Sequence, residues 1–347
     1  MRTLVFGAGA LGSLFSARLL EAGHDVTLLA RGRRLEDLRA HGVVLEAPDG
    51  ERETYQVPLT DELAEHDRFE LVIVVTQKHQ ALEVTPTLAR NRHVDTIVFL
   101  MNSAAPPEEL GRVVGAERLM LGFPTAAGQR DGVVTRVVPI RPWPMPLGEP
   151  DGRVTERTRN VADLLASMRD QRVQIRRDID AYLVSHVALL FSVLGLYAAG
   201  LEPSRFARTR DAVVLGLRAT EEAFRAQQAA GIPVTPSGLS ALPLVPEPLA
   251  VAALKPMIRS SWFGRGMFGR PAAARDELAH LIAEFRERVA PAGVAMPALD
   301  ELAAYIVEHV EPLPEGSSDL PLRWGGTLAL GGAAAAAALA LVLRRRR

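Results

Sequence analysis

The feature that most constrains the fold is the glycine-rich run Gly7-Ala8-Gly9-Ala10-Leu11-Gly12. The segment before it, Thr3-Leu4-Val5-Phe6, is apolar as in a buried strand, and the residues after it have helical spacing. Strand, G-x-G-x-x-G and helix in this order predict a dinucleotide-binding unit. Gly7 permits a sharp turn, Gly9 leaves room for a pyrophosphate, and Gly12 lets the helix pack closely on the strand. The alternative is a glycine-rich turn without a ligand.

The end of the second predicted strand indicates which dinucleotide is bound. The strand Asp25-Val26-Thr27-Leu28-Leu29 leads to Arg31, where an NAD-selective site usually carries Asp or Glu for the ribose 2′-hydroxyl. Arg33 and Arg34 follow, and guanidinium groups suit a 2′-phosphate. We therefore predict NADP as the cofactor, with a solvated basic turn as the alternative.

Two further apolar runs predict buried parallel strands that deliver polar residues to one edge of the sheet. Residues 70–76 are followed by Lys78, and residues 96–100 are followed by Asn102. Ligands of open α/β sheets bind at the carboxyl ends of the strands. Lys78 and Asn102 are therefore predicted to lie where cofactor and substrate meet, although alone Lys78 would be an ordinary loop lysine.

The chain is predicted to have an α/β fold class with two domains. Residues 1–177 form the Rossmann-type NADP-binding domain, and residues 178–311 form an all-helical domain for substrate binding and homodimerisation. The nearly uncharged stretch 181–200 is predicted to be the buried central helix of this second domain, because it carries His186 and two serines.

The last part of the chain differs in composition from both domains. Residues 312–322 have linker composition, and residues 323–347 form a hydrophobic tail that ends in four arginines. The apolar run 325–343 predicts a C-terminal hydrophobic helix that anchors the chain in a membrane, with a soluble oligomerisation helix as the alternative.

The amino-acid composition excludes several classes of partner and chemistry. The net charge of −1 gives no case for nucleic acid, and the absence of cysteine excludes disulfides, thiolate catalysis and cysteine metal sites, so no metal is predicted. Met1-Arg2 leads straight into the first strand without a signal peptide, so the nucleotide domain is expected in the cytoplasm.

The motifs resemble the ketopantoate reductase (2-dehydropantoate 2-reductase) family from Met1 to about Val310. Residues of both predicted domains carry this resemblance. They are the opening motif Gly7 to Ser13 with Gly9, Leu11 and Gly12, the 2′-phosphate arginine Arg31, the cleft lysine Lys78, the motif asparagine Asn102, the strand-pair residues Thr125 and Arg130-Asp131-Gly132, and the glutamate Glu277 before Gly293-Val294-Ala295-Met296-Pro297. The resemblance implies an NADPH-dependent reductase of a small 2-oxoacid, acting on 2-dehydropantoate in pantothenate biosynthesis.

The chain departs from the family where the catalytic residues stand. His186 replaces the family's catalytic lysine, Leu190 an asparagine and Ser103 a glycine, while Ser261 matches a substrate-contacting serine if an insertion is allowed. A histidine can donate the proton, since its unperturbed pKa is near neutrality, and Lys78 could share the role. Glu277 would accept a hydrogen bond from a substrate hydroxyl. The alternatives are a core histidine and a solvated glutamate.

Two other functions remain open from the sequence. One is a membrane-tethered nucleotide-binding module without reductase activity. The other is a related dehydrogenase that acts on a different hydroxy acid or on an opine.

Overall fold

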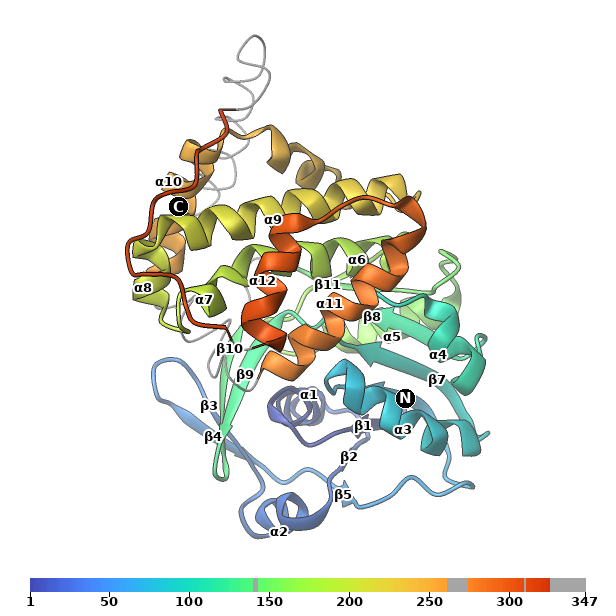
Figure 1. Ribbon diagram of the computed structural model, residues 1–347. Helices are drawn as coiled ribbons and strands as arrows, with labels where there is room; N and C mark the ends of the chain where they lie inside the picture. Colours follow the sequence, from blue (N-terminus) through green and yellow to red (C-terminus); the bar gives the residue numbers. More distant parts are fainter. Residues whose placement is uncertain (140–142, 261–273, 309, 325–347) are drawn as a thin grey trace. The chain divides into compact units, whose positions relative to one another are not determined.

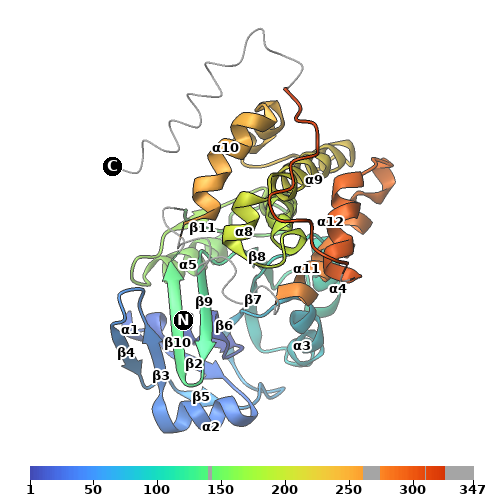
Figure 2. The same ribbon diagram turned by 60° about the vertical axis from the view of Figure 1, so that its left-hand side comes forward.

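The computed structural model describes residues 1–139, 143–260, 274–308 and 310–324 (Figures 1 and 2). The chain folds into two compact units, Met1–Leu183 and a second one that begins at Val184. Each unit is described by itself below. The predicted Ser261 and the predicted membrane helix 325–343 lie outside the described residues.

The first unit is built around an eight-stranded sheet with the order β12-β11-β8-β7-β6-β1-β2-β5. Its strands are β1 (Thr3–Phe6), β2 (Val26–Leu29), β5 (Leu59–Thr60), β6 (Phe69–Val74), β7 (Val94–Leu100), β8 (Leu119–Gly122), β11 (Met145–Gly148) and β12 (Val173–Ile175). All neighbouring pairs are parallel except β8 with β11. Because β1 lies between β2 and β6, the predicted Rossmann-type arrangement is confirmed.

Helices cover both faces of this sheet. They are α1 (Ala10–Glu21), α2 (Gly32–His41), α3 (Lys78–Arg90), α4 (Pro107–Val114) and α5 (Glu156–Ala166). Successive strand residues point to opposite faces, so Val5 packs with the core that contains Phe15 of α1, whereas Leu4 packs with the core that contains Leu88 of α3. Burial on both faces explains why the central strands are continuous apolar runs.

A second sheet of four strands, which the sequence only partly predicted, has the order β4-β3-β10-β9 (Figure 2). Its strands are β3 (Val43–Glu46), β4 (Arg52–Tyr55), β9 (Ala126–Asp131) and β10 (Val134–Pro139). The strand pair that the resemblance implies near Arg130 is present as the antiparallel pair β9–β10, but the attachment of β10 to β3 was not predicted. A Cβ built on Gly128 of β9 would lie 3.1 Å from the Cβ of Ala10. The second sheet therefore brings β9 against the first turn of α1.

The second unit is helical, as predicted. The helices that build it are α6 (Ile179–Leu190), which begins in the first unit, α7 (Gly195–Ala198), α8 (Pro203–Arg208), α9 (Arg210–Ala229), α10 (Glu247–Ile258), α11 (Arg275–Val289) and α12 (Pro297–Val307), with short 3-10 turns at Phe191–Val193, Ser237–Leu244 and Ala290–Ala292. Two glycines let the chain cross α9 at close range. A Cβ on Gly195 would lie 2.2 Å from the carbonyl oxygen of Ala212, and one on Gly216 would lie 2.2 Å from that of Ser192.

Among the described residues, the segment Ile179–Ala198 is long and apolar enough to cross a membrane, with a mean hydropathy of 1.8. The pair Ser237–Leu244 and Glu247–Ile258 passes the same test only when joined across a bend of 118°. In Ile179–Ala198, 67% of the apolar window is buried by the rest of the protein. This burial fits the predicted core helix, since a core helix needs apolar residues on most of its surface.

The predicted linker 312–322 lies along the helical unit and is held by buried carboxylates. Asp211 accepts the backbone N–H of Leu320 at 3.2 Å, and Glu247 accepts that of Arg323 at 2.7 Å. Burial alone would raise the pKa of Glu247, but its hydrogen bonds from Arg218 and Arg323 lower the pKa below its ordinary value. Backbone groups bonded in this way fix the segment in place, although its composition is typical of a flexible linker.

Candidate active site

The glycine-rich loop joins β1 to α1 and has the geometry of a phosphate cradle. Gly7 has φ +110°, a conformation that side chains with a Cβ rarely adopt. A Cβ on Gly12 would lie 1.8 Å from the carbonyl oxygen of Gly7, whereas a Cβ on Gly9 would meet no atom within 4 Å. No side chain caps the N-terminus of α1, and Leu11 packs toward the core. The loop therefore leaves open space and free N–H groups for a pyrophosphate.

Arg31 lies where β2 ends and α2 begins, as predicted. It is the exposed N-cap residue of α2, and its Nε donates to the carbonyl oxygen of Asp61 at 3.1 Å. Its guanidinium carbon lies 6.0 Å from the ring centroid of Phe6. These contacts hold the guanidinium at the carboxyl edge of the sheet, on the strand whose end chooses between the two dinucleotides.

Lys78 is the first residue of α3 and is almost completely buried, with 1% of its side chain exposed. Its Nζ lies 3.1 Å from Oε1 of Glu109 and donates to Oγ of Ser103 at 3.3 Å. Because β6 and β7 are adjacent and parallel, the residues that follow them meet at one edge. The structure thus brings Lys78 and the Asn102-Ser103 pair together. Ser103 was visible as a departure from the family motif, whereas Glu109 carried no signal in the sequence.

Replacing Glu109 with glutamine is expected to lower the free energy of unfolding by about 1–2 kcal/mol, because the buried Lys78 ammonium loses its carboxylate. The position of Lys78 at the positive end of α3 adds to this cost. Urea unfolding of the full chain measures the effect. Glu108→Gln is the matched control, since Glu108 is an exposed carboxylate in the same helical turn. Equal losses in the two variants would show that the ion pair contributes no specific stability.

The helical unit holds the two other predicted catalytic residues, His186 on α6 and Glu277 in the first turn of α11. Both are half-buried. Burial lowers the pKa of His186 to about 4, so the imidazole is neutral at pH 7. This corrects the expectation of a pKa near neutrality. Burial raises the pKa of Tyr197 to about 12, and the negative charge of Glu277 contributes to that rise, so Glu277 lies close to a buried phenol that the sequence did not single out.

The predicted site residues thus fall in two sets. The glycine loop, Arg31, Lys78 and Asn102 belong to the first unit, and His186 and Glu277 belong to the second. Within the first unit, the loop, Arg31 and Lys78 all follow parallel neighbouring strands at the carboxyl edge of one sheet.

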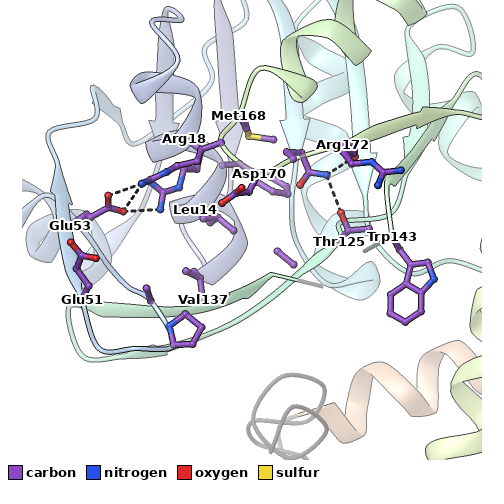
Figure 3. A pocket seen from close by; sticks show the side chains of 16 residues that line it. Leu14, Arg18, Glu51, Glu53, Thr125, Val137, Trp143, Met168, Asp170 and Arg172 are labelled. Carbon is purple, nitrogen blue, oxygen red and sulfur yellow. Dashed lines mark hydrogen bonds and ion pairs between the residues drawn. The ribbon is translucent and has the colours of Figure 1, made fainter. Parts of the chain in front are cut away.

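A cavity of about 650 Å³ in the first unit is separate from these residues (Figure 3). It is lined by α1, the second sheet and the segment 168–172. Thr125, one of the residues that carry the family resemblance, contributes to its wall, whereas the described catalytic and cofactor candidates do not. On one side Arg18 donates to Glu53 at 2.8 Å, and on the other Gln171 donates to Thr125 at 3.0 Å. Glu53 also pairs with Arg169 at 2.7 Å, so its charge is neutralised within the protein.

The fold and the glycine loop define a Rossmann-type dinucleotide-binding protein with a helical second unit. Residues 3–138 match the family described as Ketopantoate reductase PanE/ApbA. This match lies within the first unit, and for this part of the chain the resemblance seen in the motifs is confirmed.

Similar proteins extend this result. A 2-dehydropantoate 2-reductase of Archaeoglobus fulgidus is 30% identical over 174 residues, which cover 50% of this chain and 56% of that protein. The chain spans less than two thirds of the length of the curated relatives it matches.

Solved structures share the fold over most of the chain. The 2-dehydropantoate 2-reductase of Geobacter metallireducens has a TM-score of 0.71 at 20% identity and covers 89% of this chain and 100% of its own. A D-mandelate dehydrogenase solved with NADH and anilino(oxo)acetate has a TM-score of 0.67 at 14% identity, covering 88% and 96%.

Proposed function

We propose that this protein is an NADPH-dependent reductase of a 2-oxoacid, of the ketopantoate reductase type. The observation that carries the proposal is the buried Lys78 ammonium at the carboxyl edge of the same sheet that bears the open glycine loop. A fixed cation beside a dinucleotide cradle suits a substrate that carries a carboxylate next to the carbonyl to be reduced. The family match of the first unit supports the same reaction class.

In the proposed reaction the nicotinamide cofactor supplies a hydride to the carbonyl carbon. The chain must supply the rest of the chemistry. Lys78 would hold the substrate carboxylate in place of Glu109, which pairs with it in the ligand-free chain, and Asn102 beside it can orient an amide N–H or carbonyl toward the ligand. Glu277 is a hydrogen-bond acceptor for a substrate hydroxyl. The alkoxide oxygen takes its proton from an acid on this chain, for which His186 is the first candidate and Lys78 the second.

A related 2-hydroxyacid dehydrogenase is the second candidate function. It is favoured by the likeness to the D-mandelate dehydrogenase fold and by His186 in place of the family's lysine. A neutral imidazole holds a carboxylate less firmly than an ammonium does, so a substrate less polar than ketopantoate would suit this site better.

The deciding experiment follows NADPH and NADH oxidation by the full-length protein against a panel of 2-oxoacids. The panel contains ketopantoate, the same branched acid without its hydroxyl, and benzoylformate. We expect the fastest turnover with NADPH and ketopantoate. Faster turnover of benzoylformate would favour the second candidate. NADPH binding without turnover of any acid would contradict both and leave a nucleotide-binding module.

A further inference from the structure

Positive charge is concentrated at the N-terminal end of α2, where the helix dipole makes it unfavourable. Arg31 is the N-cap residue, Arg33 and Arg34 lie in the first turn, and this turn contains no acidic residue. The helix dipole places partial positive charge at the same end. Three guanidinium groups there raise the energy of the ligand-free chain, and an anion bound between them would remove that cost.

Arg34 is the buried member of this group, with 8% of its surface exposed. Its Nε donates to the carbonyl oxygen of Ala8 at 3.2 Å, and its Nη2 donates to Oγ of Ser13 at 3.0 Å. Nη1 is buried and has no hydrogen-bond partner among the residues that the structure describes. A buried guanidinium with an unpaired donor has lost its hydration at that nitrogen, and a hydrogen-bond acceptor, best an anion, would offset this cost.

A second cation reaches the same place from the other sheet. Gly128 of β9 packs against Ala10 in the first turn of α1, and Arg130 lies two residues farther along β9, on the same face of the strand. Arg130 is exposed. Burial is the largest cause that lowers the pKa of Arg34, and the positive charge of Arg130 is the next largest. The two guanidinium groups therefore repel each other. No ion pair found in the described part of the chain involves Arg34 or Arg130, and the one carboxylate whose charge raises the pKa of Arg34 is that of Asp37 on the same helix.

We propose that Arg34 and Arg130 bind a phosphate monoester, the 2′-phosphate of the cofactor's adenosine ribose. This assignment rests on the proposed function and deepens it. A monoester carries close to two negative charges, which matches two guanidinium groups better than a singly charged pyrophosphate oxygen does. Arg34 also belongs to the element that follows β2, the side of a βαβ unit that meets the ribose rather than the pyrophosphate. The β9–β10 hairpin of the second sheet thereby takes part in choosing the cofactor.

Calorimetric binding of 2′,5′-ADP and of 5′-AMP to the full-length protein tests this assignment, because the two nucleotides differ only in the 2′-phosphate. Arg34→Gln is expected to weaken 2′,5′-ADP by about 10–100-fold and 5′-AMP by less than about threefold. Arg130→Gln is expected to weaken 2′,5′-ADP by about 3–10-fold. Arg34→Lys keeps the charge but loses the fork of donors, and should give an intermediate loss.

Arg39→Gln is the matched control, since Arg39 is an exposed arginine in the last turn of the same helix, and it should change neither affinity by more than about twofold. Arg31→Gln, measured in parallel, shows how much of the discrimination between 2′,5′-ADP and 5′-AMP depends on Arg31. If Arg34→Gln does not fold, the exposed Arg130 decides through Arg130→Gln and Arg130→Glu, of which the second should give the larger loss. Equal losses for both nucleotides, or no loss in either variant, overturn the assignment. The assay contains no oxoacid, so its result is independent of whether the protein reduces any acid of the panel.

Discussion

Replacing Gly12 with alanine is expected to destabilise the first unit by about 3 kcal/mol or more and to abolish tight NADPH binding. The added Cβ would lie 1.8 Å from the carbonyl oxygen of Gly7 and 3.0 Å from its carbonyl carbon. These are backbone atoms, so the clash can be relieved only when the loop opens or α1 moves away from β1. Either change disrupts the phosphate-binding geometry of the glycine-rich loop. Thermal unfolding and a cofactor titration by fluorescence measure the two effects.

Two other glycines make this prediction specific. A Cβ on Gly9 meets no atom within 4 Å in the ligand-free chain, so Gly9→Ala should leave the melting temperature unchanged and still weaken NADPH about tenfold or more. Gly238, in the helical unit, also has open space around it, and Gly238→Ala should change neither quantity. Unchanged NADPH affinity in Gly9→Ala would place the pyrophosphate elsewhere.

Replacing His186 with alanine is expected to slow the reduction of the 2-oxoacid by roughly 10²–10⁴-fold, the usual contribution of a general acid. Burial lowers the pKa of the imidazole to about 4. Well above that pKa, the protonated fraction falls about tenfold with each pH unit, so the wild-type rate should decline as the pH rises. In His186→Lys the same burial lowers the pKa of the ammonium from its ordinary value of about 10.4, so the rate should stay flat up to a higher pH than in the wild type.

The slope of the pH profile separates a catalytic role from a structural one. His280→Ala is the control, because His280 is another half-buried histidine of the helical unit, bonded to Glu284 at 3.1 Å, and its loss should leave the slope intact. A His186→Ala enzyme with the wild-type rate and slope would remove His186 from the mechanism and assign the proton to Lys78.

The same pKa affects stability with a defined sign. The pKa of His186 falls from 6.5 to about 4 on folding, so the unfolded chain binds more protons between those pH values. The stability that this burial confers is therefore present above pH 6.5 and is lost as the pH falls through that range. His186→Leu should reduce the acid sensitivity of the unfolding transition.

Local sequence patterns were sufficient to predict the strands and the glycine-rich loop of the proposed cofactor site. The strand at Thr3-Leu4-Val5-Phe6, the glycine spacing after it and the continuous apolar runs of β6 and β7 are local features, and a buried parallel strand needs little more than such a run. The position of Arg31 followed in the same way, because it is fixed by the end of one strand. Contacts between distant segments could not be predicted by this route.

Pairings over long sequence separation explain what was missed. Glu109 pairs with Lys78 only because α3 and α4 pack on the same face of the sheet. The spacing of residues 78 and 109 in the sequence does not predict this ion pair. The hold of Asp211 and Glu247 on the segment 312–322 is likewise invisible in a composition typical of linkers. The pKa of His186 depends on burial, which sequence periodicity can suggest but cannot measure.

The sequence by itself determined the class of fold, the phosphate cradle and the charge at the end of β2, because each depends on residues close together in the chain. Only the tertiary structure decided which of three consecutive basic positions is buried against the cradle, and that a strand from a second sheet brings Arg130 to it. Side-chain burial and the approach of two cations arise from the packing of β9 on α1, across more than a hundred residues of chain. The hydrophobic periodicity of a short segment does not predict contacts between segments that are distant in the sequence.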